Sequence, residues 1–291
     1  MQFLKALALF LLTINAVYGQ GNPMVTKDSL AQKKWVDAKY ESMSLDEKLG
    51  QLFMVSVASD QSKESTDKIL ELVKNEHIGG VIFSTGGPVR QARLTNEYQK
   101  AAKTPLMIGM DAEWGLSMRL DSTYAFPYNM TLGAISDNSI VEKVGYRIGE
   151  HAKRLGVHIN FAPDIDINTN PKNPIIGNRS FGENKLKVTQ KAIAFVKGMQ
   201  SVGVLANAKH FPGHGDTASD SHKTLPVVNF SMERLDSLEL YPYKQLSKSN
   251  LASVMVAHLD IPALSLRCIV IRDKVFEFSP ILGSTIMSLA M

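Results

Sequence analysis

The densest group of chemically reactive side chains lies between Lys209 and His222, in the stretch KHFPGHGDTASDSH. Lys209 and His210 directly follow an apolar run, so a rigid strand end can aim them, whereas the proline and glycines after them favour a loop. Asp220 lies two residues before His222 and can hold one nitrogen of its imidazole ring. This pairing would make His222 a general acid/base near neutral pH.

The same cluster could hold a metal ion, because histidine and aspartate are good zinc ligands. No His-x-x-x-His pattern falls on a predicted helix, and Cys268 is the single cysteine of the sequence. The proline and glycines between the candidate ligands also give no familiar ligand spacing. We therefore predict no metal and no cofactor, and a metal-dependent hydrolase remains the second alternative.

Short apolar runs alternate with amphipathic stretches along the chain. A capping box at Ser44–Glu47 predicts a short helix before the first run, and a helical pattern begins earlier, at Trp35. Strands separated by helices indicate parallel pairing through right-handed crossovers. The predicted strands are 52–57, 80–83, 106–110, 158–161, 204–208 and 254–257, and the predicted helices are 66–75, 90–103, 139–155, 187–202 and 231–247.

Polar residues follow several of these strands directly, which helps to choose between two parallel folds. A (β/α)8 barrel gathers its reactive side chains at the carboxyl ends of many strands. A doubly wound nucleotide-binding sheet would instead place a Gly-rich turn after the first strand, and the segment MVSVA at 54–58 has none. The pattern therefore favours a barrel of the TIM type. The polar pairs are Asp111 and Glu113, Asp164 and Asp166, Lys209 and His210, and His258 and Asp260.

Four segments together resemble the β-N-acetylglucosaminidases of glycoside hydrolase family 3. The stretch 209–226, with KHFPGHGDT, DSH and LP, is similar to the signature of that group. GMDAEWG at 109–115, with Arg119 after it, resembles the family's loop after strand 3. NFAPDID at 160–166 and NRSFG at 178–182 are similar to its strand 4 segment and its Arg-Ser-Phe-Gly loop. The likeness covers roughly residues 35–263, in the family's order.

This resemblance implies a retaining glycosidase that removes terminal β-N-acetylglucosamine from peptidoglycan-type or chitin-type fragments. His222 would be the general acid/base and Asp220 its orienting partner. The reaction would pass through a covalent glycosyl-enzyme intermediate. The resemblance gives no direct role to Asp164 or Asp166, and it leaves the role of Glu113 open. The residues that it assigns to the sugar are Asp111, Arg119, Arg179, Lys209 and His210.

The sequence departs from the family where the nucleophile is expected, just after strand 7 in a segment resembling Val-Phe-Thr-Asp-Ala. Beyond Ala263 no such segment occurs, and Asp273, in the context Ile-Arg-Asp-Lys-Val, is the one aspartate there. We therefore expect an incomplete barrel of about six strand–helix units, whose activity the missing nucleophile puts in doubt. The first alternative is a non-catalytic protein that binds N-acetylglucosamine.

The ends of the chain have patterns of their own. Lys5, the apolar run 6–12 and the small residue Gly19 are typical of a secretory signal peptide, which indicates export to the periplasm or the extracellular space. The apolar run is too short for stable membrane insertion. We assign residues 1–19 to the signal peptide, 20–34 to a flexible leader, 35–263 to the partial barrel and 264–291 to an atypical tail.

The charge pattern argues against a nucleic-acid partner. The chain has 32 basic and 28 acidic residues, with a net charge of +4. These charges are interspersed, whereas a nucleic-acid surface clusters its lysines and arginines. The predicted partner is therefore a carbohydrate that contains N-acetylglucosamine.

Overall fold

A computed structural model gives the structure of residues 22–218, 225–264, 269–271, 274–276 and 286–287. Its main sheet is parallel and has the strand order β1-β2-β3-β4-β5-β6-β9. Six of these strands fall on the six predicted apolar runs, which confirms the alternating α/β pattern. The strands are β1 (Met54–Ala58), β2 (Gly80–Thr85), β3 (Met107–Met110), β4 (Ile159–Asn160), β5 (Leu205–Phe211), β6 (Ser253–Val256) and β9 (Ile286–Met287).

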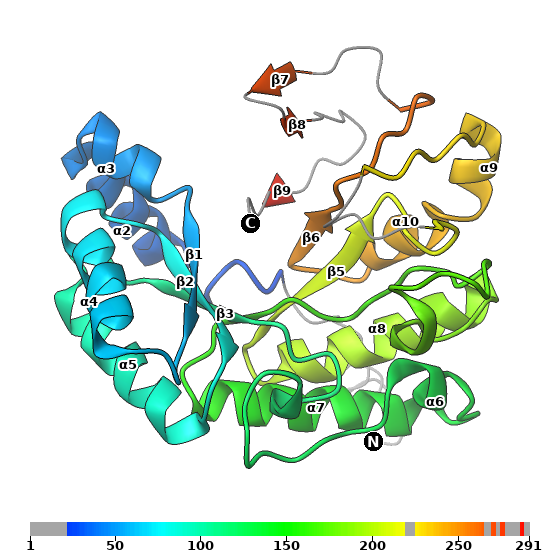
Figure 1. Cartoon of the computed structure of the whole chain (residues 1–291), viewed down its shortest axis with the longest axis horizontal. Helices are drawn as coiled ribbons and strands as arrows, with labels where there is room; N and C mark the ends of the chain where they lie inside the picture. Colours follow the sequence, from blue (N-terminus) through cyan, green and yellow to red (C-terminus); the bar gives the residue numbers. More distant parts are fainter. Residues whose placement is uncertain (1–21, 219–224, 265–268, 272–273, 277–285, 288–291) are drawn as a thin grey trace, which may run out of the picture.

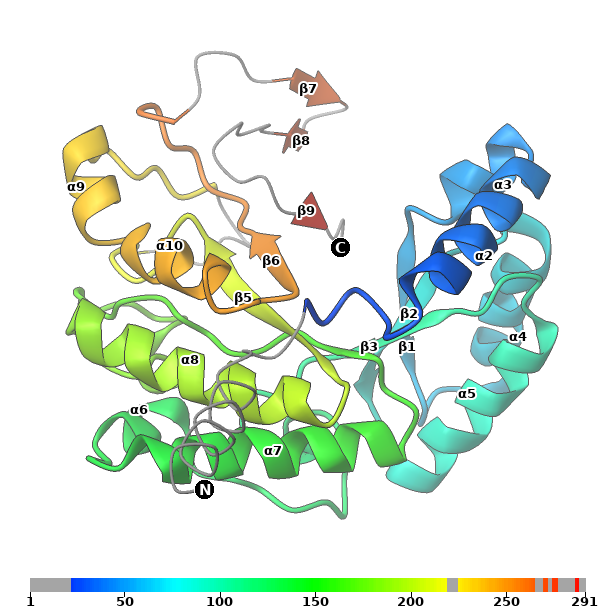
Figure 2. The same cartoon turned by 180° about the vertical axis from the view of Figure 1, so that it is seen from behind.

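Figures 1 and 2 show that the sheet curls, with the helices between consecutive strands on its outer side. Within the part of the chain that the structure describes, β9 pairs with β6 and no pairing joins β9 to β1. The predicted atypical tail adds a small antiparallel pair, β7 (Ile269–Ile271) and β8 (Lys274–Phe276). The helices that precede or link the strands are α2 (Ser29–Ser42), α3 (Leu45–Gly50), α4 (Lys63–Glu71), η1 (Leu72–Glu76), α5 (Pro88–Ala101), η2 (Leu116–Met118), α6 (Asn129–Gly133), α7 (Asn138–Arg154), η3 (Gly177–Arg179), α8 (Lys185–Ser201), α9 (Met232–Ser237) and α10 (Tyr241–Ser247).

The predicted capping box is present at the start of α3. The Ser44 hydroxyl accepts the Glu47 N–H, and the Glu47 carboxylate accepts the Ser44 N–H. The predicted flexible leader, however, extends too far, because α2 begins at Ser29 rather than near Trp35. Asp28 caps this helix by accepting the Ala31 N–H, a local signal that the polar composition of the segment obscured.

The predicted helix 231–247 is also wrong in one respect, because it is two helices. The break falls between α9 and α10, and Pro242 stands in the first turn of α10. Proline has no N–H to donate to the preceding turn, so it begins a helix more readily than it continues one.

Helices α7 and α8 pack closely because glycines face the contact. A Cβ atom at Gly145 would lie 2.2 Å from the Phe195 carbonyl oxygen, and one at Gly198 would lie 2.0 Å from that of Glu142. Only glycine permits backbones to approach so closely. The two helices support β4 and β5, which carry much of the polar cluster described below.

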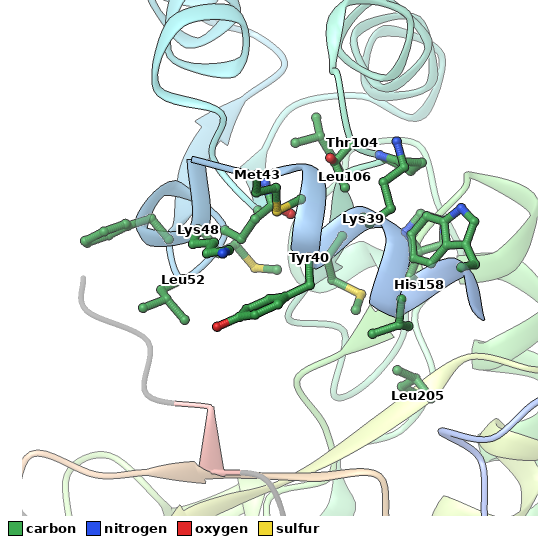
Figure 3. A pocket seen from close by; sticks show the side chains of 18 of the residues that line it. Lys39, Tyr40, Met43, Lys48, Leu52, Thr104, Leu106, His158 and Leu205 are labelled. Carbon is green, nitrogen blue, oxygen red and sulfur yellow. The ribbon is translucent and has the colours of Figure 1, made fainter. Parts of the chain in front are cut away.

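A large apolar pocket, of about 740 Å³, lies at the amino ends of the strands. It is lined by α2, by the segment 48–54 and by the first residues of β2, β3 and β5. Figure 3 shows Lys39 and Tyr40 of α2, and Met43 directly after this helix, on the same pocket as Leu106, His158 and Leu205. The polar residues singled out in the sequence follow the opposite, carboxyl ends of the strands. In parallel α/β folds ligands bind at those ends, so this pocket is not the candidate site.

Candidate functional site

The candidate site is built at the carboxyl ends of β3, β4 and β5. Lys209 on β5 is buried, and its Nζ lies 2.7 Å from Asp111 Oδ1 and 2.8 Å from Glu113 Oε1. Both carboxylates follow β3, within the loop that leads to η2. One buried cation thus joins two strand ends that are far apart in the sequence.

Two arginines complete this network. Arg119 Nη2 lies 2.6 Å from the second oxygen of Asp111. Arg179, at the end of η3, donates to Glu113 from Nε at 3.0 Å and from Nη2 at 2.7 Å. The Asn129 side-chain amide donates to the Arg179 carbonyl and holds its loop. Such a paired geometry fixes the guanidinium plane as well as its charge.

The charges of this network support one another. Burial alone would raise the pKa of Asp111 and Glu113, but Lys209 and the arginines hold the pKa of both carboxyls below their ordinary values. Burial alone would lower the pKa of Lys209, and Asp111 and Glu113 outweigh this effect and raise it. All three groups are therefore ionised at neutral pH.

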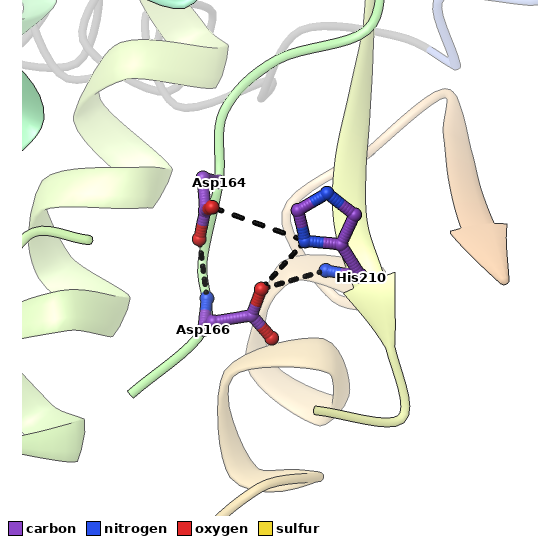
Figure 4. Close-up of side chains that lie close together, drawn as sticks. All are labelled: Asp164, Asp166 and His210. Atoms are coloured by element: carbon purple, nitrogen blue, oxygen red, sulfur yellow. Dashed lines mark hydrogen bonds and ion pairs between the residues drawn. The ribbon is translucent and has the colours of Figure 1, made fainter. Parts of the chain in front are cut away.

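His210 joins this network to a second pair of carboxylates, shown in Figure 4. Its Nδ1 lies 2.7 Å from Asp166 Oδ2, and its Nε2 lies 3.2 Å from Arg179 Nη2. Asp166 also accepts the backbone N–H groups of His210 and His214. Asp164 accepts the Asp166 N–H, while its other oxygen is buried without a hydrogen-bond partner.

Asp164, Asp166 and His210 are close enough together to offer three ligand atoms to a metal ion. Two features favour hydrogen bonding over metal binding. Asp166 already accepts three N–H groups, and the Arg179 guanidinium is 3.6 Å from Asp164 Oδ2, where it would repel a cation. The arrangement suits a network that orients His210.

The loop after β5 is anchored as far as the structure describes it. The His214 side chain contacts the Thr217 hydroxyl, and Asn173 donates to the His214 carbonyl at 2.7 Å. Asp220 and His222, the predicted catalytic pair, lie outside the described residues, as does Asp273. The structure therefore brings together all five predicted sugar-binding residues and leaves the predicted acid/base untested.

Sequence reasoning assigned no role to Glu113, Asp164 and Asp166, yet all three are buried within the cluster. Their signal was visible in the sequence, because each stands three to five residues beyond a strand-like segment and has a polar partner two residues away. The sequence pattern did not show which side chains these carboxylates contact, namely Lys209 and Arg179 for Glu113, Arg179 for Asp164 and His210 for Asp166. In this cluster fixed carboxylates alternate with guanidinium and ammonium groups. The carboxylates can accept hydrogen bonds from a ligand rich in hydroxyls, and the cations can donate hydrogen bonds to it.

Comparison with known proteins identifies relatives over most of the chain. The model of the family described as Glycosyl hydrolase family 3 N terminal domain matches residues 44–275. Beta-hexosaminidase A of Pseudoalteromonas piscicida is 35% identical over 258 residues, which are 83% of this chain and 42% of that protein. A protein of Cellulomonas fimi named Beta-N-acetylglucosaminidase/beta-glucosidase is 32% identical over 79% of this chain and 40% of its own length.

Solved structures agree. A glycoside hydrolase family 3 beta-N-acetylglucosaminidase from Paenibacillus sp. str. FPU-7 has 38% identity and a TM-score of 0.71, over 78% of this chain and 44% of its own. Beta-glucoside phosphorylase BglX has 30% identity and a TM-score of 0.77, over 82% of this chain and 42% of its own. These likenesses confirm the predicted TIM-barrel class. The chain spans about two-fifths of the length of these four relatives.

Proposed function

The chain belongs to glycoside hydrolase family 3, and from this premise we propose that its buried polar cluster binds the terminal β-N-acetylglucosamine of a glycan. The observation that supports the proposal best is Lys209, held between Asp111 and Glu113 at 2.7 and 2.8 Å. Asp111 would accept hydrogen bonds from sugar hydroxyls, while Lys209, Arg119 and Arg179 would donate them. His210 would contact the same ring.

We propose that the chemistry is hydrolysis with retention of configuration. In this scheme His222 protonates the leaving oxygen and Asp220 orients its ring, and a carboxylate attacks the anomeric carbon to give a glycosyl-enzyme intermediate. The sequence 264–291 has no segment resembling the family's nucleophile loop. The alternative is therefore that the chain binds the sugar without cleaving it, and the experiments below measure binding and turnover separately.

The first test measures binding of N-acetylglucosamine to the chain by calorimetry, in the wild type and in Asp111→Asn. The substitution removes a charged acceptor, so affinity should fall by about tenfold or more. Asp121→Asn is a matched control, because Asp121 forms an exposed ion pair with Arg90 at 2.8 Å outside the cluster. Equal affinities in Asp111→Asn and the wild type, or no binding to the wild type, would refute the proposed site.

The second arm adds a chromogenic N-acetyl-β-glucosaminide. Turnover that is lost in His222→Ala would support the glycosidase, whereas binding without turnover would support the sugar-binding alternative. A relative is named a beta-glucoside phosphorylase, so the assay is repeated with inorganic phosphate, and release stimulated by phosphate would indicate phosphorolysis. Loss of turnover on adding a chelator would instead favour the metal-dependent hydrolase.

We also propose that the protein is exported, with cleavage after Gly19. The observation behind this is the sequence pattern of residues 1–19, which lie outside the described residues. None of the helices that the structure describes is long and apolar enough to cross a membrane. Expression in a bacterium followed by N-terminal sequencing should yield a chain that starts at Gln20, whereas an intact Met1 in the secreted or periplasmic fraction would contradict the cleavage.

A further inference from the structure

The hydrogen bonds around His210 fix the position of its proton. Arginine has N–H donors and no acceptor, so the nitrogen that faces Arg179 Nη2 at 3.2 Å, Nε2, must offer a lone pair. The opposite nitrogen, Nδ1, lies 2.7 Å from a carboxylate oxygen of Asp166 and must carry the proton. A doubly protonated ring would set an N–H against the guanidinium. His210 is therefore neutral, with its proton on Nδ1.

Asp166 is placed to enforce this state. Its side chain is buried and accepts three N–H groups, two of them from the backbone at His210 and His214. The backbone contacts fix the carboxylate, and the fixed carboxylate then dictates which nitrogen of His210 is protonated. Asp164, two residues earlier, makes no hydrogen bond to His210, since the distance from Oδ2 to Nδ1 is 3.8 Å.

We propose that Asp166 is a positioning residue, whose carboxylate holds His210 in the Nδ1–H tautomer and makes Nε2 a fixed acceptor beside Arg179. The effect of this tautomer on sugar binding rests on the proposed function. The lone pair of Nε2 accepts from Arg179 Nη2, so the neutral ring holds the guanidinium in place beside Lys209, and these donors need no reorganisation when the sugar binds. Asp166 would thus affect affinity through His210, without touching the ligand.

The pKa values of His210, Asp164 and Asp166 agree with this geometry. Burial lowers the pKa of His210 to about 3, and the positive charges of Arg179 and Lys209 add to the effect. Burial raises the pKa of both aspartates. Two backbone N–H groups donate to Asp166 and counteract the rise in its pKa, whereas Asp164 accepts one N–H. Asp164 is therefore the member of the pair that takes up a proton.

The test is the tautomer itself, read from the ring nitrogens of the full chain labelled with ¹⁵N-histidine. Long-range ¹H–¹⁵N spectra distinguish Nδ1–H, Nε2–H and charged rings, and the His210 signal is assigned from its loss in His210→Gln. We expect the neutral Nδ1–H form at pH 7 without any sugar present. An Nε2–H or charged His210 in the wild type would overturn the proposal, and this result does not depend on whether the aspartate variants fold. An ion held by the three side chains would also require a lone pair on Nδ1 and would fail the test in the same way.

A matched pair of variants then separates Asp166 from its neighbour. Asp166→Asn should change the tautomer or leave it mixed and should weaken N-acetylglucosamine binding by about 10- to 100-fold. Asp164→Asn replaces a protonated acid with a neutral amide of similar shape, so the His210 spectrum should stay as in the wild type. An Asp166→Asn protein that keeps both the Nδ1–H form and the wild-type affinity would refute the proposal. Failure of the proposed function would look different, because the wild type would then bind no N-acetylglucosamine whatever its histidine spectrum.

Discussion

Replacing Lys209 with methionine is expected to destabilise the fold by about 3–5 kcal/mol and to abolish sugar binding. Methionine keeps most of the length of the side chain but removes the charge. The change would leave Asp111 and Glu113 buried and facing each other, with the arginines as their remaining cations. An uncompensated buried carboxylate is far more costly than a lost surface pair, because the protein interior cannot replace its hydration.

The measurement is urea unfolding of the wild type and the variant at pH 7, together with the calorimetric titration. Lys197→Met is the matched control, because Lys197 pairs with Glu142 at 3.0 Å on the surface and that pair should contribute less than about 1 kcal/mol. If Lys209→Met costs no more than Lys197→Met, the buried network does not stabilise the fold. Part of the lost stability should return at lower pH, because protonation neutralises one of the two carboxylates that have lost Lys209.

Much of this site could be predicted because parallel strands end at one edge. Asp111 and Lys209 are 98 residues apart, yet each follows an apolar run, and the barrel pattern alone predicted that they would lie near each other. Arg179 is different, since it lies in the loop between β4 and α8 with no periodic pattern to place it. Its assignment came from the resemblance of the NRSFG segment to a family loop, and the structure supplies the reason in its paired contact with Glu113.

Other features depend on contacts that a linear pattern does not contain. The proton of His210 is set by Asp166 on one side and Arg179 on the other, which come from different loops. The strand β9 has only two residues, too few for any alternation to be read, and it is defined by its pairing with Val254 and Met255. The break before α10 could have been predicted from Pro242, since proline at that position was visible in the sequence.

Asp164 is expected to make the stability of the protein fall as pH rises between 5 and 7. Burial, and then the neighbouring charge of Asp166, raise the pKa of Asp164 to about 8 in the folded chain, against about 3.9 for an unfolded aspartate. Between these two values the native state keeps a proton that the unfolded state has lost. Unfolding therefore releases a proton, and a rise in pH favours the unfolded state.

The size of the effect follows from linkage, at up to about 1.4 kcal/mol per pH unit, or about 2.7 kcal/mol between pH 5 and 7. Urea unfolding of the wild type and Asp164→Asn across this range isolates the contribution of Asp164, because asparagine cannot titrate. Titrating groups that behave alike in the two proteins drop out of the difference between their free energies of unfolding. Asp111 and Glu113 have lowered pKa values, so the stability they contribute is lost only at more acidic pH and falls outside the window. A difference that stays constant from pH 5 to 7 would mean that Asp164 is ionised in the folded protein. Its buried oxygen would then carry a charge without a hydrogen-bond partner, and Arg179 at 3.6 Å would have to be the cation that stabilises it.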